Sequence, residues 1–164
     1  MNEDLASLFW LLTHGVYVIG VTHEHKDNAF TAAWVMQVSF DPLLLALSIN
    51  PGHSSCDMLI QGGVFSVNVL PHDRQGLARR FGRPAATGKL EGIRWHRGAT
   101  GAPILDEAMA YFDCEFSHKC PAGDHVIVVG RVVDGAVFDP QAVPMNYRDT
   151  GDMDGSSVLY PDDF

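Results

Sequence analysis

Residues 28–55 read NAFTAAWVMQVSFDPLLLALSINPGHSS, and this stretch carries most of the information about the fold. Residues 30–40 alternate between two kinds of side chain, which predicts a strand with two different faces. Its bulky, apolar face carries Ala32, Trp34, Met36, Val38 and Phe40, and its smaller, partly polar face carries Thr31, Ala33, Val35, Gln37 and Ser39. Asp41-Pro42 predicts a corner, and the apolar run over residues 43–49 is typical of a buried strand.

Outward from this stretch, the chain continues as short strands with small helices between them. Further strands are predicted over residues 16–21, 64–70, 109–116 and 126–133, with a polar turn over 23–28. Helices are predicted near residues 5–12, from Ser54 or Ser55 to 61, and from Asp73 to 81, while 83–103 and the tail after 140 lack periodicity. The absence of a strand–helix–strand rhythm favours a closed, mainly β architecture, and the 164 residues suit a single domain over 1–164.

Composition and missing motifs exclude several classes of function. The net charge of −9 argues against a nucleic-acid partner. No GxGxxG motif follows a strand, so a dinucleotide-binding Rossmann site is not supported. The apolar runs are too short to span a bilayer, and the acidic N-terminus is unlike a signal peptide. Three cysteines without paired spacing favour a reducing, cytoplasmic setting.

The basic residues are concentrated in one part of the chain. Seven of them and a single acid, Glu91, lie between Arg74 and Arg97, whereas the rest of the chain is strongly acidic. This basic island (residues 74–97) has two interpretations: a solvated helix and loop, or a site for a small anion.

The stretch 28–55 also contains groups that suit a flat aromatic ligand with a phosphate. Thr31, Ala33 and Ser39 give a strand face without bulk, and Ser48 and Asn50 end the next strand. His53-Ser54-Ser55 offers hydroxyl and amide groups at the start of a helix, where phosphates bind, and the basic island at Arg79-Arg80 is expected to add charge-assisted contacts to the same phosphate. The alternative is that small residues on a strand face only pack against another strand.

Three segments, taken in order, resemble the flavin reductase-like family. They are residues 28–55, the pair GGVFSVNVLP and LARRFG (62–71 and 77–82), and GDHVIVVGRVVDG (123–135). The resemblance implies an FMN-binding split β-barrel with Greek-key topology and small flanking helices, working as a homodimer.

The resemblance also assigns residues to a flavin site. Positions matching the family's flavin-binding residues are Thr31, Ala32, Ala33, Trp34, Ser39, Ser48, Ile49, Asn50, Ser54, Ser55, Arg80 and Phe81. His125, in Gly123-Asp124-His125, matches a residue placed near the nicotinamide. The implied activity is reduction of FMN, or alternatively FAD, by NADH or NADPH, with delivery to a flavin-dependent monooxygenase or another electron acceptor.

Several alternatives stay open at this point. The same fold would also serve a tightly bound FMN that carries electrons without turnover, and other split barrels hold haem or pyridoxal phosphate. The tail, with Asn146-Tyr147 and then an acidic stretch, departs from the best-known reductases and leaves open how the nicotinamide side is covered. His23-x-His25 is better explained as a polar hairpin than as a metal site, and Cys56 as a packing residue.

Overall fold

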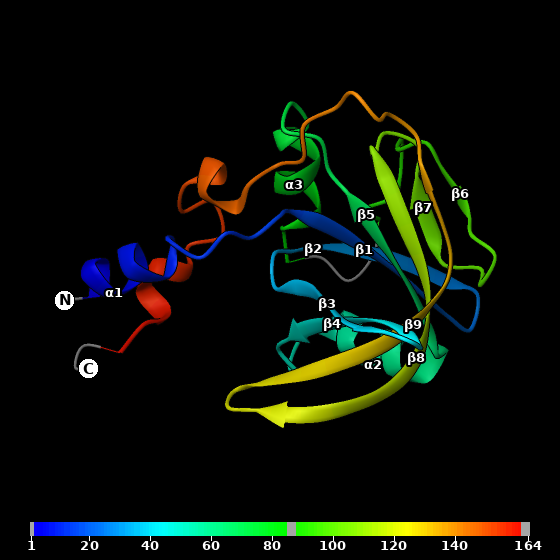
Figure 1. Cartoon of the computed structure of the whole chain (residues 1–164), viewed down its shortest axis with the longest axis horizontal. Helices are drawn as coiled ribbons and strands as arrows, with labels where there is room; N and C mark the ends of the chain where they lie inside the picture. Colours follow the sequence, from blue (N-terminus) through cyan, green and yellow to red (C-terminus); the bar gives the residue numbers. More distant parts are fainter. Residues whose placement is uncertain (1, 85–87, 162–164) are drawn as a thin grey trace.

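The computed structural model describes residues 2–84 and 88–161, and its main feature is an antiparallel sheet of seven strands. The strand order is β2-β1-β5-β8-β9-β4-β3, and the sheet curls around a core (Figure 1). The strands are β1 (Tyr17–His23), β2 (Lys26–Ala32), β3 (Val35–Phe40), β4 (Leu43–Ile49), β5 (Val64–Val69), β6 (Trp95–Arg97), β7 (Pro103–Leu105), β8 (Ala110–Ala122) and β9 (His125–Val137). The expected mainly β fold is confirmed, whereas the single domain over 1–164 stays a prediction.

The barrel is split where its two edge strands, β2 and β3, part from each other. They are consecutive in the chain, but β2 pairs with β1 and β3 pairs with β4. Ala33 and Trp34 between them belong to neither strand, although the Ser48 N–H donates to the Trp34 carbonyl at 3.0 Å. The prediction of one continuous strand over 30–40 is therefore wrong, since the strand is interrupted in its middle. Side-chain alternation along the sequence does not reveal a change of pairing partner.

The hairpin between β1 and β2 is tighter than expected. The predicted polar turn over 23–28 is reduced to Glu24 and His25, whose φ angles of 48° and 63° are left-handed. A two-residue turn with positive φ at both positions has a backbone twist that fits the right-handed twist of the flanking strands. Both strands can therefore continue up to the turn. In contrast, the buried strand predicted over 43–49 is confirmed as β4.

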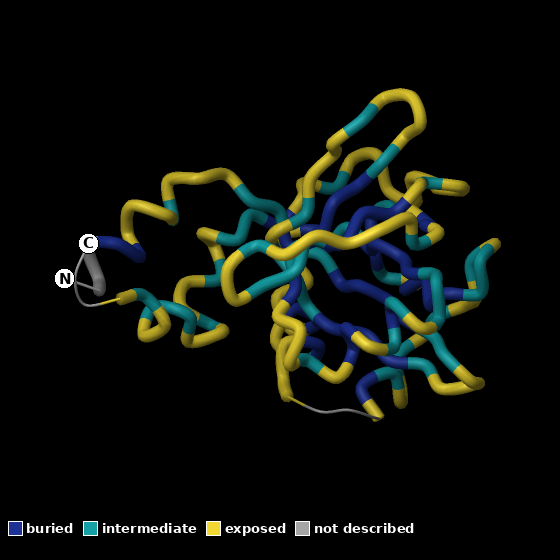
Figure 2. The backbone as a smooth tube through the Cα atoms, turned by 90° about the horizontal axis from the view of Figure 1, so that it is seen from below, coloured by how far each residue is buried: buried dark blue, intermediate teal, exposed yellow. Residues whose placement is uncertain are grey.

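The core lies on both sides of β1. Ile19 and Val21 pack inside the barrel with residues of β4, β5 and α2, while Val16 and Val18 pack with α3 and Met145 of the tail. Figure 2 shows that the buried segments are concentrated within the barrel. The helices are α1 (Asn2–Phe9), α2 (Ser54–Gly62) and α3 (Gln75–Phe81), with 3-10 turns η1 (Tyr147–Thr150) and η2 (Ser156–Leu159).

Both ends of the described chain form an arm beside the barrel, defined here as residues 5–14 and 147–161. Phe9 stacks on Tyr160 with ring centroids 5.4 Å apart, and α1 lies against η2 away from the sheet (Figure 1). Of the apolar face predicted for the first helix, Leu5 is buried, whereas Leu8, Phe9 and Leu12 are exposed. Two isolated bridges, Gly15–Asn146 and Pro71–Pro144, fix the tail to the barrel, so it is more ordered than its sequence suggests.

Asn68 on β5 joins three elements of the barrel. Its buried side-chain amide donates to the carbonyl of Val18 at 3.0 Å and to that of Pro103 at 3.3 Å. Its Oδ1 accepts from the Leu105 N–H at 2.8 Å. This side chain therefore holds the β6–β7 pair against the main sheet.

We expect Asn68→Leu to lower the free energy of unfolding by about 3 kcal/mol, because it leaves buried backbone groups without partners. Urea denaturation measures the loss. The exposed amide of Gln75 provides the control, since Gln75→Leu has no such network to break. Equal stability of the two variants would contradict this role of Asn68.

Candidate functional site

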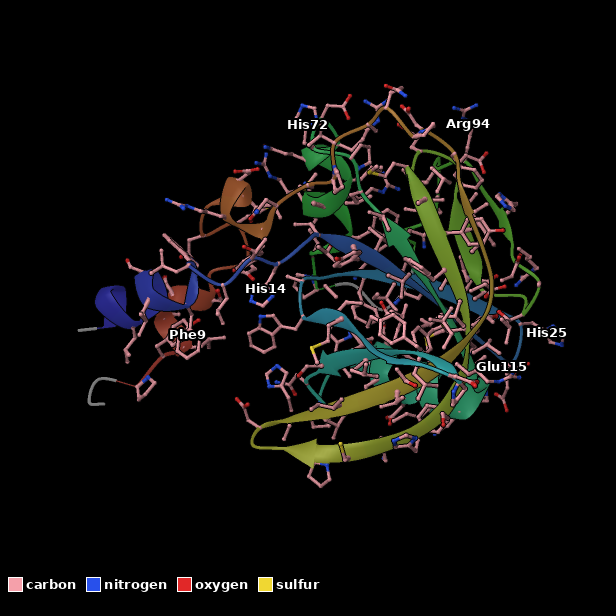
Figure 3. All side chains as sticks on the ribbon, viewed as in Figure 1. Phe9, His14, His25, His72, Arg94 and Glu115 are labelled. Atoms are coloured by element: carbon pink, nitrogen blue, oxygen red, sulfur yellow. The ribbon has the colours of Figure 1, made fainter. Side chains whose placement is uncertain are left out.

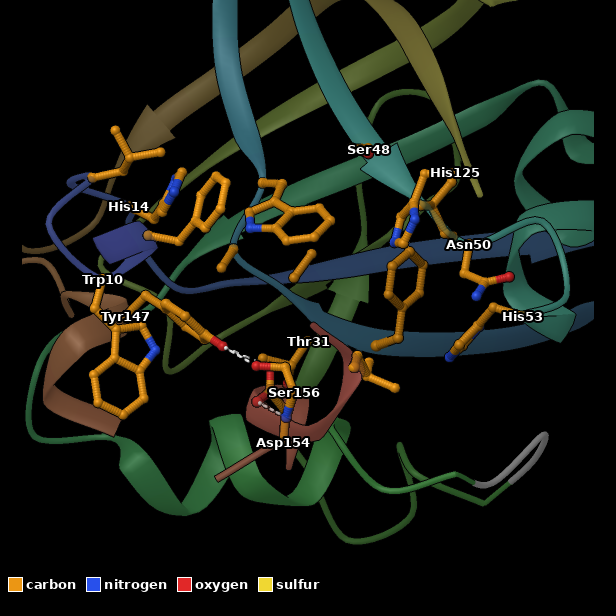
Figure 4. A pocket seen from close by; sticks show the side chains of 18 of the residues that line it. Trp10, His14, Thr31, Ser48, Asn50, His53, His125, Tyr147, Asp154 and Ser156 are labelled. Atoms are coloured by element: carbon orange, nitrogen blue, oxygen red, sulfur yellow. Dashed lines mark hydrogen bonds between the residues drawn. The ribbon is translucent and has the colours of Figure 1, made fainter. Parts of the chain in front are cut away.

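A cavity of about 450 Å³ opens at the split of the barrel. One wall comes from the ends of β2 and β4, the residues that follow these two strands, and the first residue of β9. The opposite wall comes from the arm (Figure 4). We call it the ring pocket. Of the sequence-predicted residues, those that line it are Thr31, Ala32, Ala33, Trp34, Ser48, Ile49, Asn50 and His125.

Five predicted residues lie outside the lining of the ring pocket. Ser39 pairs with Leu44 near the far end of β3. Ser54 is exposed at the start of α2, whereas Ser55 is fully buried and its hydroxyl accepts from the Asn28 amide. The remaining two, Arg80 and Phe81, lie on α3.

The two α3 residues have structural roles instead. Phe81 is fully buried in the core, and the Arg80 guanidinium donates to the backbone carbonyls of Lys89 and Glu91. Arg80 thereby holds the loop after α3 in place, so its charge is not directed into the ring pocket. The expected helix start at Asp73 is also displaced, because Arg74 is the N-cap and makes no side-chain cap bond.

Thr31 has a structural bond that its sequence position did not reveal. Its hydroxyl donates to the Ala78 carbonyl at 2.7 Å and ties the end of β2 to α3. The wall that Thr31, Ala32 and Ala33 present to the ring pocket therefore consists of backbone and small apolar groups. Such a wall suits the face of a flat ring.

His53 is a pocket residue whose role the sequence analysis missed. It is the N-cap of α2, where a serine was expected, and its Nδ1 accepts from the Ser55 N–H at 3.2 Å. Burial and, to a lesser degree, the nearby Lys89 charge lower the pKa of His53, which favours the neutral ring. Because Nδ1 accepts, the neutral ring carries its proton on Nε2 and is a donor there. The ring packs on Phe30 and reaches from α2 into the pocket (Figure 4).

His125 lies across the pocket from the arm, at the first residue of β9. Its Nδ1 is 2.7 Å from Asp124 Oδ1, and its ring lies 5.1 Å from the Trp34 ring. The hydrogen bond and the charge of His125 lower the pKa of Asp124, which keeps that carboxyl ionised. The orientation of the imidazole is therefore set by a neighbouring carboxylate and an aromatic ring.

The arm side of the pocket is held by a network around Tyr147. Its hydroxyl donates to Asp154 Oδ2 at 2.9 Å and lies 3.0 Å from Ser156 Oγ. Burial, together with the Asp154 carboxylate, raises the pKa of Tyr147 to about 12, so the hydroxyl keeps its proton. Tyr147 thus lines the pocket, whereas Asn146 is not among the lining residues, and this arrangement depends on contacts distant in sequence.

A second cavity, of about 340 Å³, adjoins the ring pocket and shares Thr31, Ala32 and Ala33 with it. Arg79 and Arg83 line this second cavity. Both belong to the basic island, and their spacing along the chain does not separate them from their neighbours, because only the fold shows which charges are already paired.

Two further features of residues 2–84 and 88–161 concern metal ligands and membrane-spanning helices. No cluster of three or more histidine, cysteine or acidic side chains that could hold a metal ion occurs there. Asp27, beside the His23-x-His25 hairpin, is instead paired with Arg97 at 2.8 Å. None of the helices in the same residues has the length and hydropathy needed to cross a membrane.

Histidine at the cap of α2 makes the stability of the protein depend on pH. Folding lowers the pKa of His53, so its contribution is present above the ordinary value of 6.5 and is lost as the pH falls through the lowered value. We expect His53→Asn, which keeps a side-chain cap without titrating, to flatten the pH dependence of the free energy of unfolding between about pH 7 and pH 5. The exposed His118 supplies the control, and an unchanged slope in His53→Asn alone would contradict the assignment.

Comparison with known proteins gives a consistent result. The model of the flavin reductase like domain matches residues 10–155. The chain is 34% identical over 125 residues to the NADH-dependent FMN reductase AsuE2 of Streptomyces nodosus subsp. asukaensis, covering 74% of this chain and 68% of that one. It is 26% identical over 155 residues to diflavin flavoprotein A 1 of Synechocystis sp., covering 92% of this chain but only 27% of that relative. It therefore spans about a quarter of the length of the diflavin flavoproteins that it matches.

Among solved structures, the chain is similar to BorF, the flavin reductase component of a bacterial two-component tryptophan halogenase. The TM-score is 0.78 and the sequence identity is 30%, with 88% of this chain and 98% of that chain covered.

Proposed function

The chain belongs to the flavin reductase-like family, and on that premise we propose that it reduces FMN with NADH or NADPH and passes the electrons to a partner. The observation that carries the proposal is the ring pocket, where small residues and His125 line one wall and the arm lines the other. FAD is the alternative flavin. Flavin-dependent monooxygenases and halogenases are the class of partner that the relatives suggest.

The residues of the ring pocket fit a flavin. The pocket volume of about 450 Å³ suits a three-ring ligand, and Thr31, Ala32 and Ala33 leave room for a ring to lie against the chain. Asn50 Oδ1 accepts from the Gly52 N–H, which directs the amide NH₂ of Asn50 to other partners. The Asn50 NH₂ group and the His53 Nε2–H group are therefore two neutral hydrogen-bond donors for the oxygen-rich ring edge or the phosphate of the ligand.

The start of α2 is the proposed place of the flavin phosphate. The exposed Ser54, the cap residue His53 and the positive end of a nine-residue helix lie together there. Ser55, whose hydroxyl is buried against Asn28, contributes its backbone and not its side chain in this proposal.

The chain supplies orientation and exclusion of water, whereas a bound flavin supplies the hydride-accepting ring. His125, oriented by Asp124 and Trp34, borders the side of the pocket open to a second ring and docks the nicotinamide. The arm covers the same cavity from the other side and limits access of water.

A flavin-holding electron carrier is the second candidate. The arm already occupies one side of the ring pocket, with Tyr147, Asp154 and Ser156 bonded to one another. If these segments stay closed, no second ring stacks on the flavin, and the protein holds FMN without turnover. Wild-type protein that bleaches only with dithionite, and not with NADH or NADPH, would favour this carrier.

We expect His125→Ala to keep FMN affinity and to slow flavin reduction at limiting NADH by about tenfold or more, about 1.4 kcal/mol of transition-state stabilisation. Stopped-flow absorbance of the FMN-loaded protein measures the rate, and His118→Ala on the same hairpin is the control. Wild-type rates at every NADH concentration would refute the docking role.

We further propose a homodimer that covers the outer face of β3. Met36 is 64% exposed and Phe40 is 88% exposed on this edge strand, and Leu43 follows at 42%. Apolar side chains at this density on an edge strand favour burial against another chain. We also propose a cytoplasmic setting, because the three cysteines are free.

We expect Phe40→Glu to convert the dimer into a monomer, because a carboxylate would have to be buried in the interface. Sedimentation velocity at micromolar protein measures the change. Val143→Glu, at an exposed apolar residue outside β3, should remain dimeric. A wild-type monomer, or a dimer that tolerates Phe40→Glu, would contradict this interface.

A further inference from the structure

Most basic side chains of the basic island are engaged within the fold, either in ion pairs or in hydrogen bonds to backbone carbonyls. Arg74 pairs with Glu107 at 3.1 Å, and Arg97 pairs with Asp27. Arg80 donates to two backbone carbonyls, and the buried Lys89 donates to the Phe81 carbonyl at 3.1 Å. These four groups therefore brace the structure and are not available to a ligand.

Arg79 and Arg83 are different from these four. Within the described residues, no carboxylate lies within ion-pair distance of either guanidinium, and both groups line the second cavity. Arg94, the remaining arginine of the island, directly precedes β6 and is not among the residues that line this cavity (Figure 3). In a chain with a net charge of −9, two uncompensated arginines on one cavity favour an anionic ligand.

The second cavity is placed to receive a part of a ligand whose ring lies in the ring pocket. The two cavities share Thr31, Ala32, Ala33, Tyr147 and Asp154. Asp154 is the one acidic side chain among the residues that line the second cavity, and its oxygens accept from the Tyr147 hydroxyl and the Ser156 N–H. These two donors are neutral and do not cancel the carboxylate charge, so two guanidinium groups against one carboxylate leave the lining with an excess of positive charge.

We propose that Arg79 and Arg83 bind the diphosphate of the nicotinamide dinucleotide that donates the hydride. This inference rests on the proposed function and adds the binding site of its second substrate. Two guanidinium groups match the two charges of a diphosphate, and arginine is suited to bidentate phosphate contacts. The flavin phosphate has its own donors at the start of α2, on the side of the ring pocket formed by Asn50 and His53.

A direct binding measurement tests the site without turnover. ADP-ribose, which contains the diphosphate but no nicotinamide, is titrated calorimetrically into the FMN-loaded protein, with adenosine as the phosphate-free probe. We expect R79Q/R83Q to weaken ADP-ribose binding at least tenfold, and R94Q to leave it unchanged. Both arginines of the site are exposed, so the double variant should keep the wild-type melting temperature.

Reduction kinetics provide the second measurement. The double variant should require at least tenfold more NADH for half-maximal reduction of bound FMN, with an unchanged limiting rate. Its reduction by 1-benzyl-1,4-dihydronicotinamide, a hydride donor without phosphates, should equal that of the wild type. A defect with NADH but not with the phosphate-free donor distinguishes loss of diphosphate binding from general damage to the pocket.

The outcomes separate this inference from the proposed function. Weaker FMN binding with unchanged riboflavin binding would overturn it and assign the arginines to the flavin phosphate. Wild-type ADP-ribose affinity in R79Q/R83Q would also overturn it. If neither hydride donor reduces the wild-type protein, the reductase function fails, while the ADP-ribose titration still decides whether the anion site exists.

Discussion

The parting of the chain between β2 and β3 is the constraint on which the rest of the structure depends. A sheet that curls into a barrel must either close its edges by hydrogen bonds or leave them apart, and here the two edges are consecutive strands. Ala33 and Trp34 cross the gap outside the ladder, and they border both the ring pocket and the start of the exposed β3 face. The ligand cavity and the proposed subunit contact therefore originate from the same break in pairing.

The sequence predicted those parts of the site that lie on continuous strands. Leu43–Ile49 is a simple apolar run, so β4 and the positions of Ser48, Ile49 and Asn50 at its end followed directly. The break at Ala33-Trp34 did not, because both segments keep the same alternation and only the pairing partner changes. Phe81 was assigned to the ligand on resemblance, yet its large apolar ring, at the end of α3, is fully buried in the core.

Contacts between distant segments account for what sequence reasoning missed. The cap formed by His53 requires the ring to turn back on α2 while it packs on Phe30. The basic island supports both of its interpretations at once, since Arg74 and Arg97 are paired surface groups and Arg79 and Arg83 line a cavity. Charge spacing along a chain cannot separate these cases, because the neutralising acids come from elsewhere in the fold.

The arm has a consequence for how long a bound ligand stays. Its segments come from the two ends of the described chain and carry highly exposed apolar side chains, so their local opening costs less free energy than unfolding of the barrel. A ligand that contacts both walls favours the closed arm by mass action, and the closed arm in turn slows its escape. Contacts with both walls then contribute to affinity, whereas the opening rate of the arm limits the residence time.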